Sequence, residues 1–294
     1  MARRDARRFV LPIVACLVLG GLSPQVAGAE GRPEVTDVAH RGASAYAPEN
    51  TLAAVVAAAD LGASVVEIDV QRTADGELVL MHDTDLVRTT DAEEVFPGRD
   101  SYDVVDFTSA EVDRLDAGSW FDPSFAGEPV PTLAEALDLM RKRKVALLLE
   151  VKAPARYPGI ELDIADELAR HPWWLKPSPP GKVHRLVVQS FDWESMRRSQ
   201  DLLPDVPHGL LGRVDEADIP TYATWADQIN PSHTTADAAY VSAVQEAGLE
   251  VFVYTVNDAD DMRAQIENGV DGIITNYPDV LLDVIAEGSV KAAA

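Results

Sequence analysis

Three carboxylates stand inside strongly apolar stretches of the sequence. Glu67 and Asp69 lie two residues apart in the run 65–70, and Glu150 follows the apolar run 146–149. A buried carboxylate is costly unless it is paired with a cation or bound to a metal ion. Three oxygen ligands without a thiolate are typical of a site for a hard cation such as Mg²⁺ or Ca²⁺. The pattern therefore predicts that Glu67, Asp69 and Glu150 bind a divalent cation.

Groups that could move a proton or bind an anion lie close to the ends of the same kind of segment. His40 and His82 each follow an apolar run, and histidine titrates near neutral pH, as a general acid or base must. Arg41 and Lys152 would supply local positive charge for an anionic substrate in a chain whose net charge is −24. Together with the carboxylates, they predict metal-assisted chemistry on a phosphate ester.

Each of these signals also has a structural explanation. A single histidine at a strand end is more often a hydrogen-bonded structural residue than a catalyst. A Glu-x-Asp pair is more often a solvated face or an ion-pair partner. Only convergence of all these residues on one place in the fold favours the functional explanation.

The elements that would position these residues alternate along the chain. Short β-branched runs alternate with amphipathic segments, which predicts parallel βαβ units. The predicted strands cover residues 35–40, 65–71, 78–82, 145–152, 186–191, 207–211, 228–231, 251–256 and 272–275. The predicted helices include 51–61, 133–141, 160–170, 236–247 and 259–268, and Gly62, Gly248 and Gly269 follow three of them. The tail beyond Val284 is expected to fray.

About eight units in a chain of this length predict an α/β fold, the (β/α)8 TIM barrel. The active site of such a barrel lies at the C-terminal ends of its strands, where this chain also offers Gln189, Asn230, Asn257 and Asn276. A doubly wound open sheet is the alternative, although no glycine-rich phosphate loop follows any predicted strand. Residues of about 84–131 break the alternation, and we expect them to form a small insertion over one mouth of the barrel.

Composition and charge limit the classes of function. The 294 residues are 47% hydrophobic and 25% charged, which excludes wholesale disorder and fits one barrel domain over residues 30–294. The acidic net charge argues against a nucleic acid or an anionic membrane surface as a partner. A small-molecule substrate is the expected partner.

Residues 1–29 have the pattern of a signal peptide. Four arginines precede an apolar stretch at residues 9–22, and Ala27-Gly28-Ala29 forms a cleavage pattern. The stretch is shorter than the ~20 residues of a membrane span, so we expect cleavage after Ala29 and a secreted or cell-envelope protein without a stable span. A lipoprotein processed at Cys16 is the less favoured alternative. Cleavage after Ala29 removes this single cysteine, and with it any disulfide or thiol chemistry.

The motifs, taken in order over about residues 35–285, resemble the glycerophosphodiester phosphodiesterase family in its secreted bacterial form. The resemblance rests on His40-Arg41-Gly42-Ala43, Pro48-Glu49-Asn50-Thr51, Glu67-Ile68-Asp69-Val70, His82-Asp83, Glu150-Val151-Lys152, Gln189-Ser190-Phe191 and Asp271-Gly272-Ile273-Ile274-Thr275-Asn276. It implies two catalytic histidines, three ligands of Ca²⁺ or Mg²⁺, and phosphate binding by Arg41 and Lys152. It also implies substrate contacts by Gln189, Tyr254 and Asn257, where Tyr254 stands at a position at which tryptophan is commoner in the family.

The resemblance implies metal-dependent hydrolysis of glycerophosphodiesters to an alcohol and glycerol 3-phosphate. We expect His40 to act as the general base and His82 as the general acid. Within the family, the glycerol 2-hydroxyl is thought to attack first and to give a cyclic phosphate. Two alternatives stay open: a phospholipase D-like hydrolase of sphingomyelin or lysophospholipids, and a secreted barrel that binds a phosphate ligand without catalysis.

Overall fold

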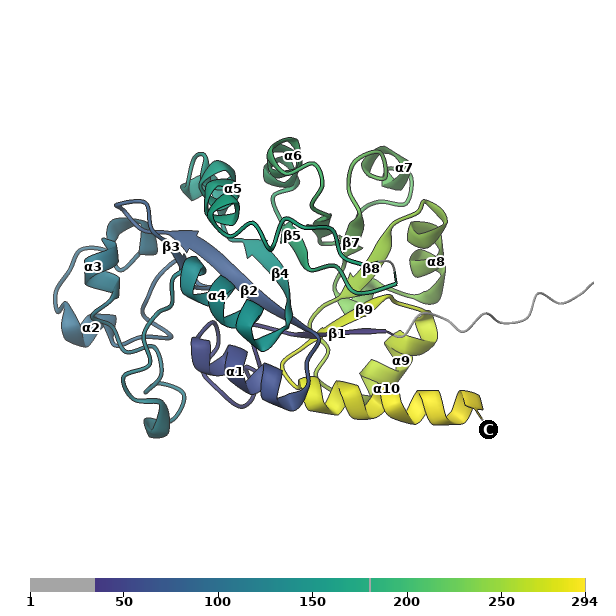
Figure 1. The fold of residues 1–294 in the computed structure, drawn as a ribbon, viewed down its shortest axis with the longest axis horizontal. Coiled ribbons are helices and arrows are strands. Elements are labelled where there is room, and N and C mark those ends of the chain that lie inside the picture. The colour runs from purple at the N-terminus through teal and green to yellow at the C-terminus, as the bar shows by residue number, and fades with distance from the viewer. Residues whose placement is uncertain (1–34, 180, 294) are drawn as a thin grey trace, which may run out of the picture. The chain divides into compact units, whose positions relative to one another are not determined.

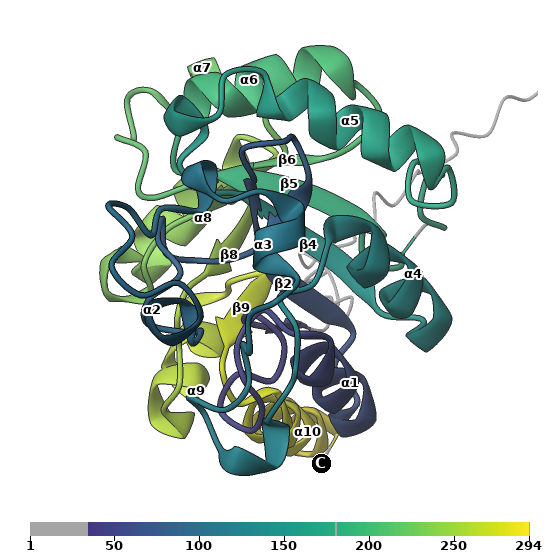
Figure 2. The same ribbon diagram turned by 90° about the vertical axis from the view of Figure 1, so that its left-hand side faces the viewer.

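The protein folds as a closed parallel barrel in a computed structural model that describes residues 35–179 and 181–293 (Figures 1 and 2). The predicted signal peptide and Cys16 lie outside the described residues. The eight barrel strands are β1 (Thr36–Ala39), β2 (Val65–Arg72), β4 (Ala146–Val151), β5 (Leu186–Ser190), β6 (His208–Leu211), β7 (Gln228–Asn230), β8 (Glu250–Val253) and β9 (Gly272–Thr275).

Pairing of the first strand closes the barrel. β1 is hydrogen-bonded in parallel to β9 on one side and to β2 on the other, with Val38 opposite both Ile274 and Val65. A ninth strand, β3 (Leu78–Leu80), pairs antiparallel with β2 and lies outside the ring. The predicted (β/α)8 fold is therefore confirmed, and the alternative of an open doubly wound sheet is wrong.

Helices surround the strands on the outside (Figures 1 and 2). They are α1 (Leu52–Leu61), α4 (Leu133–Arg143), α5 (Ile160–Arg170), α6 (Trp193–Leu202), α7 (Ile219–Tyr222), α8 (Ala238–Glu246), α9 (Ala259–Asn268) and α10 (Pro278–Ala293). The expectation that the chain frays after Val284 is wrong, because α10 continues to Ala293. Val284 packs into the core, and Arg263 holds Glu287 at 3.0 Å. No helix among the described residues is long and apolar enough to cross a membrane.

Local sequence signals set the helix ends. The Thr51 side chain accepts a hydrogen bond from the Ala54 N–H and so caps the start of α1. Thr132 and Glu135 form a reciprocal capping box at the start of α4. Gly62 and Gly269 end α1 and α9 with φ of 94° and 90°, a left-handed conformation that glycine adopts at no steric cost.

Alternation along each strand decides what fills the barrel. On β2, Val66, Ile68 and Val70 belong to the outer core beneath the helices, whereas Val65 belongs to a separate apolar cluster with Leu148 of β4. Because successive side chains point to opposite faces of a sheet, Glu67 and Asp69 point inward on the same side as Val65. The interior is thus apolar toward the start of β2 and acidic toward its end.

The segment predicted as an insertion contains short elements with a core of their own. It holds α2 (Ala92–Val95) and α3 (Ser109–Val112) and three-residue turns at Val104–Asp106 and Pro123–Phe125. Its buried apolar side chains are Leu86, Ala92, Val104, Phe107, Val112, Leu115, Ala117 and Val130, packed with Val79 and Met81. The segment lies beside β3, at the left of Figure 1. After it, α4 leads back to the barrel strand β4.

Candidate active site

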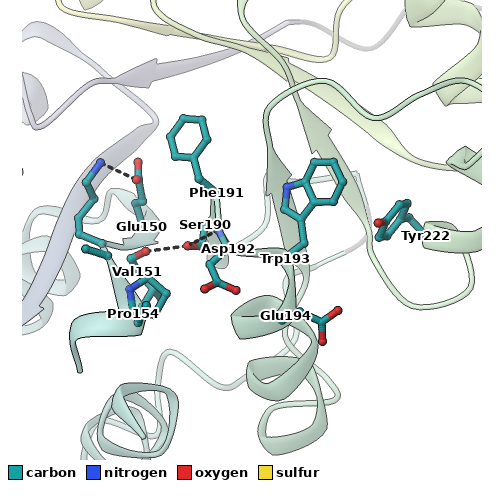
Figure 3. Close-up of a pocket in the computed structure, with 12 residues that line it drawn as sticks. Glu150, Val151, Pro154, Ser190, Phe191, Asp192, Trp193, Glu194 and Tyr222 are labelled. Carbon is teal, nitrogen blue, oxygen red and sulfur yellow. Dashed lines mark hydrogen bonds and ion pairs between the residues drawn. The ribbon is translucent and has the colours of Figure 1, made fainter. Parts of the chain in front are cut away.

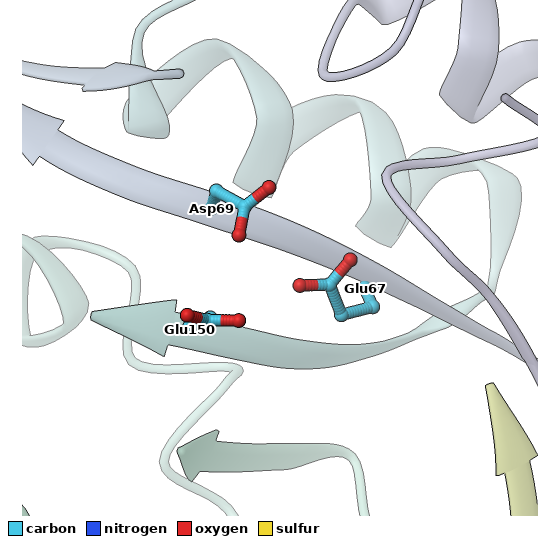
Figure 4. A group of neighbouring side chains, drawn as sticks. All are labelled: Glu67, Asp69 and Glu150. Carbon is cyan, nitrogen blue, oxygen red and sulfur yellow. The ribbon is translucent and has the colours of Figure 1, made fainter. Parts of the chain in front are cut away.

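Three inward-pointing carboxylates meet at the end of the barrel interior (Figure 4). Glu67 and Asp69 come from β2 and Glu150 comes from β4, whose register places it directly opposite Asp69. One oxygen of each carboxylate lies within 4.8 Å of those of the other two. Glu67 and Asp69 are each 1% exposed and Glu150 is 7% exposed. The structure therefore brings together the three predicted metal ligands, and only oxygen atoms face one another.

The charges in this cluster are unbalanced. Burial, together with the nearby Asp69 carboxylate, raises the pKa of Glu67 well above its usual value and that of Glu150 to about 7. Burial also opposes ionisation of Asp69, but Lys152 and Arg41 together hold its pKa below the usual range. The Oδ1 atom of Asp69 is buried without a hydrogen-bond partner. An oxygen-only donor set with surplus negative charge and an unpartnered oxygen fits a divalent cation.

Two cationic side chains lie against the cluster. The Arg41 Nε atom lies 3.3 Å from Asp69 Oδ2, and the Lys152 Nζ atom lies 2.6 Å from Glu150 Oε1 and 3.5 Å from Asp69 Oδ1. Arg41 adopts φ of 56°, an unusual value for a residue with a side chain, and its backbone N–H donates to Glu67 Oε2 at 2.8 Å. The backbone and the side chain of Arg41 thus contact two different ligands of the cluster.

His40 follows β1 and is held by an amide. Its Nδ1 atom lies 2.7 Å from the Asn276 side-chain oxygen, which can only accept a hydrogen bond. The proton of neutral His40 therefore sits on Nδ1, and Nε2 keeps a free lone pair. Burial, with a smaller effect of Arg41, lowers the pKa of His40 to about 4, so the ring is neutral at neutral pH.

His82 is held by a carboxylate instead. Its Nδ1 atom lies 2.7 Å from Asp83 Oδ1, and Asp83 Oδ2 accepts a hydrogen bond from Arg88 Nε at 2.5 Å. The hydrogen bond from Arg88 lowers the pKa of Asp83 to about 2, so this carboxylate stays ionised beside the His82 ring. The two histidines thus have different partners, a neutral amide behind His40 and an ionised carboxylate behind His82.

Comparison with known proteins identifies the relatives of this site. The sequence profile of the Glycerophosphoryl diester phosphodiesterase family matches residues 40–280. The chain belongs to this family. The resemblance predicted from the motifs is confirmed, and with it membership of a family of phosphoric diester hydrolases.

Relatives of this glycerophosphoryl diester phosphodiesterase family member match over nearly their whole length. A glycerophosphodiester phosphodiesterase of Bacillus subtilis (strain 168) is 35% identical over 84% of this chain and 85% of its own. One from Caldanaerobacter subterraneus is 34% identical over 85% of this chain and 98% of its own. A phosphodiesterase from Oleispira antarctica, solved in complex with the product sn-glycerol-3-phosphate, superposes with a TM-score of 0.75. It is 28% identical and covers 85% of this chain and 96% of its own.

The other residues predicted to contact the substrate lie around the carboxylate cluster and differ in how far they are buried. Gln189 is 1% exposed on β5, next to Glu150 in register, and its side-chain oxygen accepts from Asn230 at 2.9 Å. The Tyr254 ring is partly buried, 5.7 Å from that of Phe191. Asn257 is exposed, and its oxygen accepts from the Asn276 backbone N–H at 2.9 Å. Asn257 therefore supports the amide that holds His40. The roles of Gln189, Tyr254 and Asn257 in substrate binding stay predictions.

Three residues of the site carry no role in the sequence prediction. Asn50 donates from Nδ2 to Asp69 Oδ2 at 2.8 Å and accepts from the Asp69 backbone N–H at 3.0 Å, which ties Asn50 to both the side chain and the backbone of Asp69. Glu49 accepts hydrogen bonds from Arg41 and from Arg88, at 2.8 Å each. The sequence signal for Glu49 and Asn50 is their place in the motif Pro48-Glu49-Asn50-Thr51. Arg88 has no such signal, because it comes from the insertion.

The imbalance of charge predicts that Glu67→Gln stabilises the protein when no metal is available. A neutral amide can still accept from the Arg41 N–H but is no longer repelled by Asp69. We expect the melting temperature in EDTA to rise by a few degrees, since about 1 kcal/mol corresponds to roughly 2–4 °C in a domain of this size. The further rise caused by excess Ca²⁺ or Mg²⁺ should shrink, because one ligand charge is lost.

The matched control for this prediction is Glu267→Gln on the exposed side of α9, which should change neither melting temperature. The raised pKa values of Glu67 and Glu150 also predict how the effect of Ca²⁺ on the melting temperature changes with pH. Protons compete with the cation, so the rise caused by Ca²⁺ should be smaller at about pH 6 than at about pH 8. A lower melting temperature of Glu67→Gln in EDTA would contradict the account of the charges.

Proposed function

We propose that this chain hydrolyses glycerophosphodiesters to an alcohol and glycerol 3-phosphate, with a divalent cation and two histidines of opposite role. The observation that carries the proposal is that the two histidines have different hydrogen-bond partners. An amide holds His40 and an ionised carboxylate holds His82, and both rings interact electrostatically with Asp69 of the acidic cluster. The relatives described above support this function rather than a sphingomyelin hydrolase or a barrel without catalysis.

Phosphate binding is assigned to the cationic side chains and the acidic cluster. A divalent cation held by Glu67, Asp69 and Glu150 would offset the charge of the phosphodiester and polarise the attacking hydroxyl. Arg41 and Lys152 stay protonated, since the carboxylates around them raise the pKa of both despite burial. Their N–H groups can therefore donate to the phosphate oxygens while negative charge builds up on them.

Proton transfer is assigned to the Nε2 atoms of the two histidines. Neutral His40 has a lone pair on Nε2 and can accept the proton of the attacking hydroxyl, whether this comes from water or from the substrate glycerol. The Asn276 oxygen holds Nδ1–H and so keeps His40 in that tautomer. His82 is assigned to donate from Nε2 to the departing oxygen, and the ionised Asp83 carboxylate holds its Nδ1 atom in place. An alkoxide needs this proton, since it is otherwise a poor leaving group.

Release of glycerol 3-phosphate tests the function. We expect it from glycerophosphocholine, glycerophosphoethanolamine and glycerophosphoglycerol, and we expect no product from sphingomyelin. A chelator should abolish the release, and Ca²⁺ or Mg²⁺ should restore it, because three carboxylates without a cation repel the anionic substrate. Sphingomyelin cleavage without glycerophosphodiester cleavage would replace the proposal with the lipid-hydrolase alternative. Full activity in thoroughly chelated protein would remove the cation from the mechanism.

Substitution of the histidines tests the division of labour. We expect His40→Ala and His82→Ala each to lower kcat by on the order of 10²–10⁴ with a choline ester. With a p-nitrophenyl ester, whose leaving oxygen needs little protonation, His82→Ala should lose far less and His40→Ala as much as before. Recovery in His40→Ala instead would exchange the two roles. Recovery in neither would leave both residues as phosphate-positioning groups.

We also propose that residues 1–29 direct export of the chain. The four arginines, the apolar stretch and the Ala27-Gly28-Ala29 pattern support this proposal. When the full chain is produced in a bacterial host, N-terminal sequencing of the exported protein should begin at Glu30. A lipid-modified N-terminus at Cys16 would show the lipoprotein route instead, and an intact N-terminus retained in the cell would contradict export.

A further inference from the structure

A cavity of about 590 Å³ opens beside the carboxylate cluster, at the C-terminal ends of β4 and β5 (Figure 3). Glu150 lines the side that adjoins the cluster, with Lys152 paired to it at 2.6 Å, and Trp193 and Tyr222 line the other. Phe191 lies between the two sides in the view of Figure 3. A phosphate bound at the cluster would direct one of its two ester groups into this cavity. The proposed chemistry makes no other use of it.

The cavity presents aromatic rings in fixed positions. The Phe191 side chain is 56% exposed, and its ring meets that of Tyr254 edge to face at 5.7 Å. Trp193 donates from Nε1 to the Leu211 carbonyl at 2.8 Å, and its ring meets that of Tyr222 at 5.1 Å. These contacts hold the rings without a ligand. Faces of Trp, Tyr and Phe rings attract a cation, most strongly where water is displaced.

Charge around the cavity favours a cation as well. Its lining includes the carboxylates of Glu150, Asp192 and Glu194. Lys152 is the single basic side chain among the described lining residues, and Glu150 and Asp69 already neutralise it at 2.6 Å and 3.5 Å. Asp192 uses Oδ1 to cap α6 through the Ser195 N–H at 2.9 Å, which leaves its charge at the cavity. Beyond these ion pairs, Asp192 and Glu194 give the lining a net negative charge.

The rest of the wall discriminates against a polyol. It consists of Val151, Ala153, Pro154 and Ala155, whose side chains offer no hydrogen-bond partner, and of Ser190, whose hydroxyl donates to the Val151 carbonyl at 2.8 Å. A sugar-like alcohol would leave several hydroxyls unpaired against such a wall, and unpaired buried polar groups are costly. A trimethylammonium group, in contrast, needs no hydrogen bonds and buries its methyl groups against apolar atoms and rings.

We propose that this cavity binds a quaternary ammonium group on the alcohol part of the substrate. The site thus prefers glycerophosphodiesters of a cationic amino alcohol over those of a neutral alcohol or a polyol. The preference comes from the faces of Phe191 and Trp193 together with the Asp192 carboxylate. It rests on the proposed function, because the phosphate must lie at the carboxylate cluster for the ammonium group to reach the rings.

The test compares two substrates of the same shape. Glycerophosphocholine and the glycerophosphate ester of 3,3-dimethylbutanol differ in the charge of one central atom. We expect kcat/KM of the unaltered protein to favour the choline ester by about tenfold, within the range of a desolvated cation–π contact. We also expect tetramethylammonium to inhibit competitively the hydrolysis of glycerophosphoglycerol, which carries no cation.

Paired variants connect the preference to the cavity. Phe191→Leu removes the ring and Phe191→Tyr keeps it, so only the first should lower the ratio of the two kcat/KM values, by about three- to tenfold. Asp192→Asn removes the charge but keeps a side chain that caps α6, and it should lower the ratio similarly. Asp201→Asn, an exposed aspartate at the end of α6, is the control for charge and should leave the ratio as it is.

The outcomes separate this inference from the proposed function. If none of the diesters releases glycerol 3-phosphate, the proposed function fails and the inference fails with it. If the diesters are hydrolysed but the ratio is near one, the cavity does not select a cation. A ratio of about ten that neither Phe191→Leu nor Asp192→Asn changes would also overturn the assignment. If the Phe191→Leu protein fails to fold, the unaltered protein provides the test. Competitive inhibition by tetramethylammonium then supports the assignment, and its absence overturns it.

Discussion

The enclosure of three carboxylates in one small volume is the constraint on which the rest of the site depends. Glu67, Asp69 and Glu150 cannot move apart, because β2 and β4 hold them in a hydrogen-bonded ladder with Asp69 opposite Glu150. Because the carboxylates cannot separate, neighbouring side chains must offset their mutual repulsion. Arg41 and Lys152 supply charge, and Asn50 supplies two hydrogen bonds to Asp69. A rigid, under-neutralised set of oxygens is suited to a cation and to an anionic ester bound on it.

The same charges extend from the barrel into the insertion. Arg41 contacts Glu49, Glu49 contacts Arg88, and Arg88 contacts Asp83 behind His82, so that positive and negative groups alternate along one continuous path. The insertion thereby supplies, through Arg88, the contact that holds Asp83 behind His82. No such path reaches the ring of His40, whose hydrogen-bond partner is the neutral Asn276. The asymmetry between the histidines thus arises from the residues behind them rather than from the rings.

Much of this arrangement could be predicted from the sequence. The spacing of Glu67 and Asp69 inside an apolar run places both on one face of a strand, and strand–helix alternation indicates where the strand ends meet. Local patterns do not report contacts between distant segments, however. The bond between His40 and Asn276 joins residues 236 positions apart, and Arg88 comes from a segment without periodicity. The expectation that the chain frays beyond Val284 is likewise wrong, because α10 continues to Ala293, with Ile285 packed against the core and Glu287 paired with Arg263 of α9.

The closure of the ring by β9 also has a consequence for the order in which the site is completed during synthesis. All three carboxylates, both histidines, Arg41 and Lys152 are present once about half of the chain has been made. The amide that orients His40 arrives only with Asn276, in the turn between the last strand and the last helix. A partial polypeptide can therefore contain every charged group of the site and still lack the hydrogen bond that orients His40. That bond forms only after the C-terminal strand has joined the first, so the site and the closed barrel are completed together.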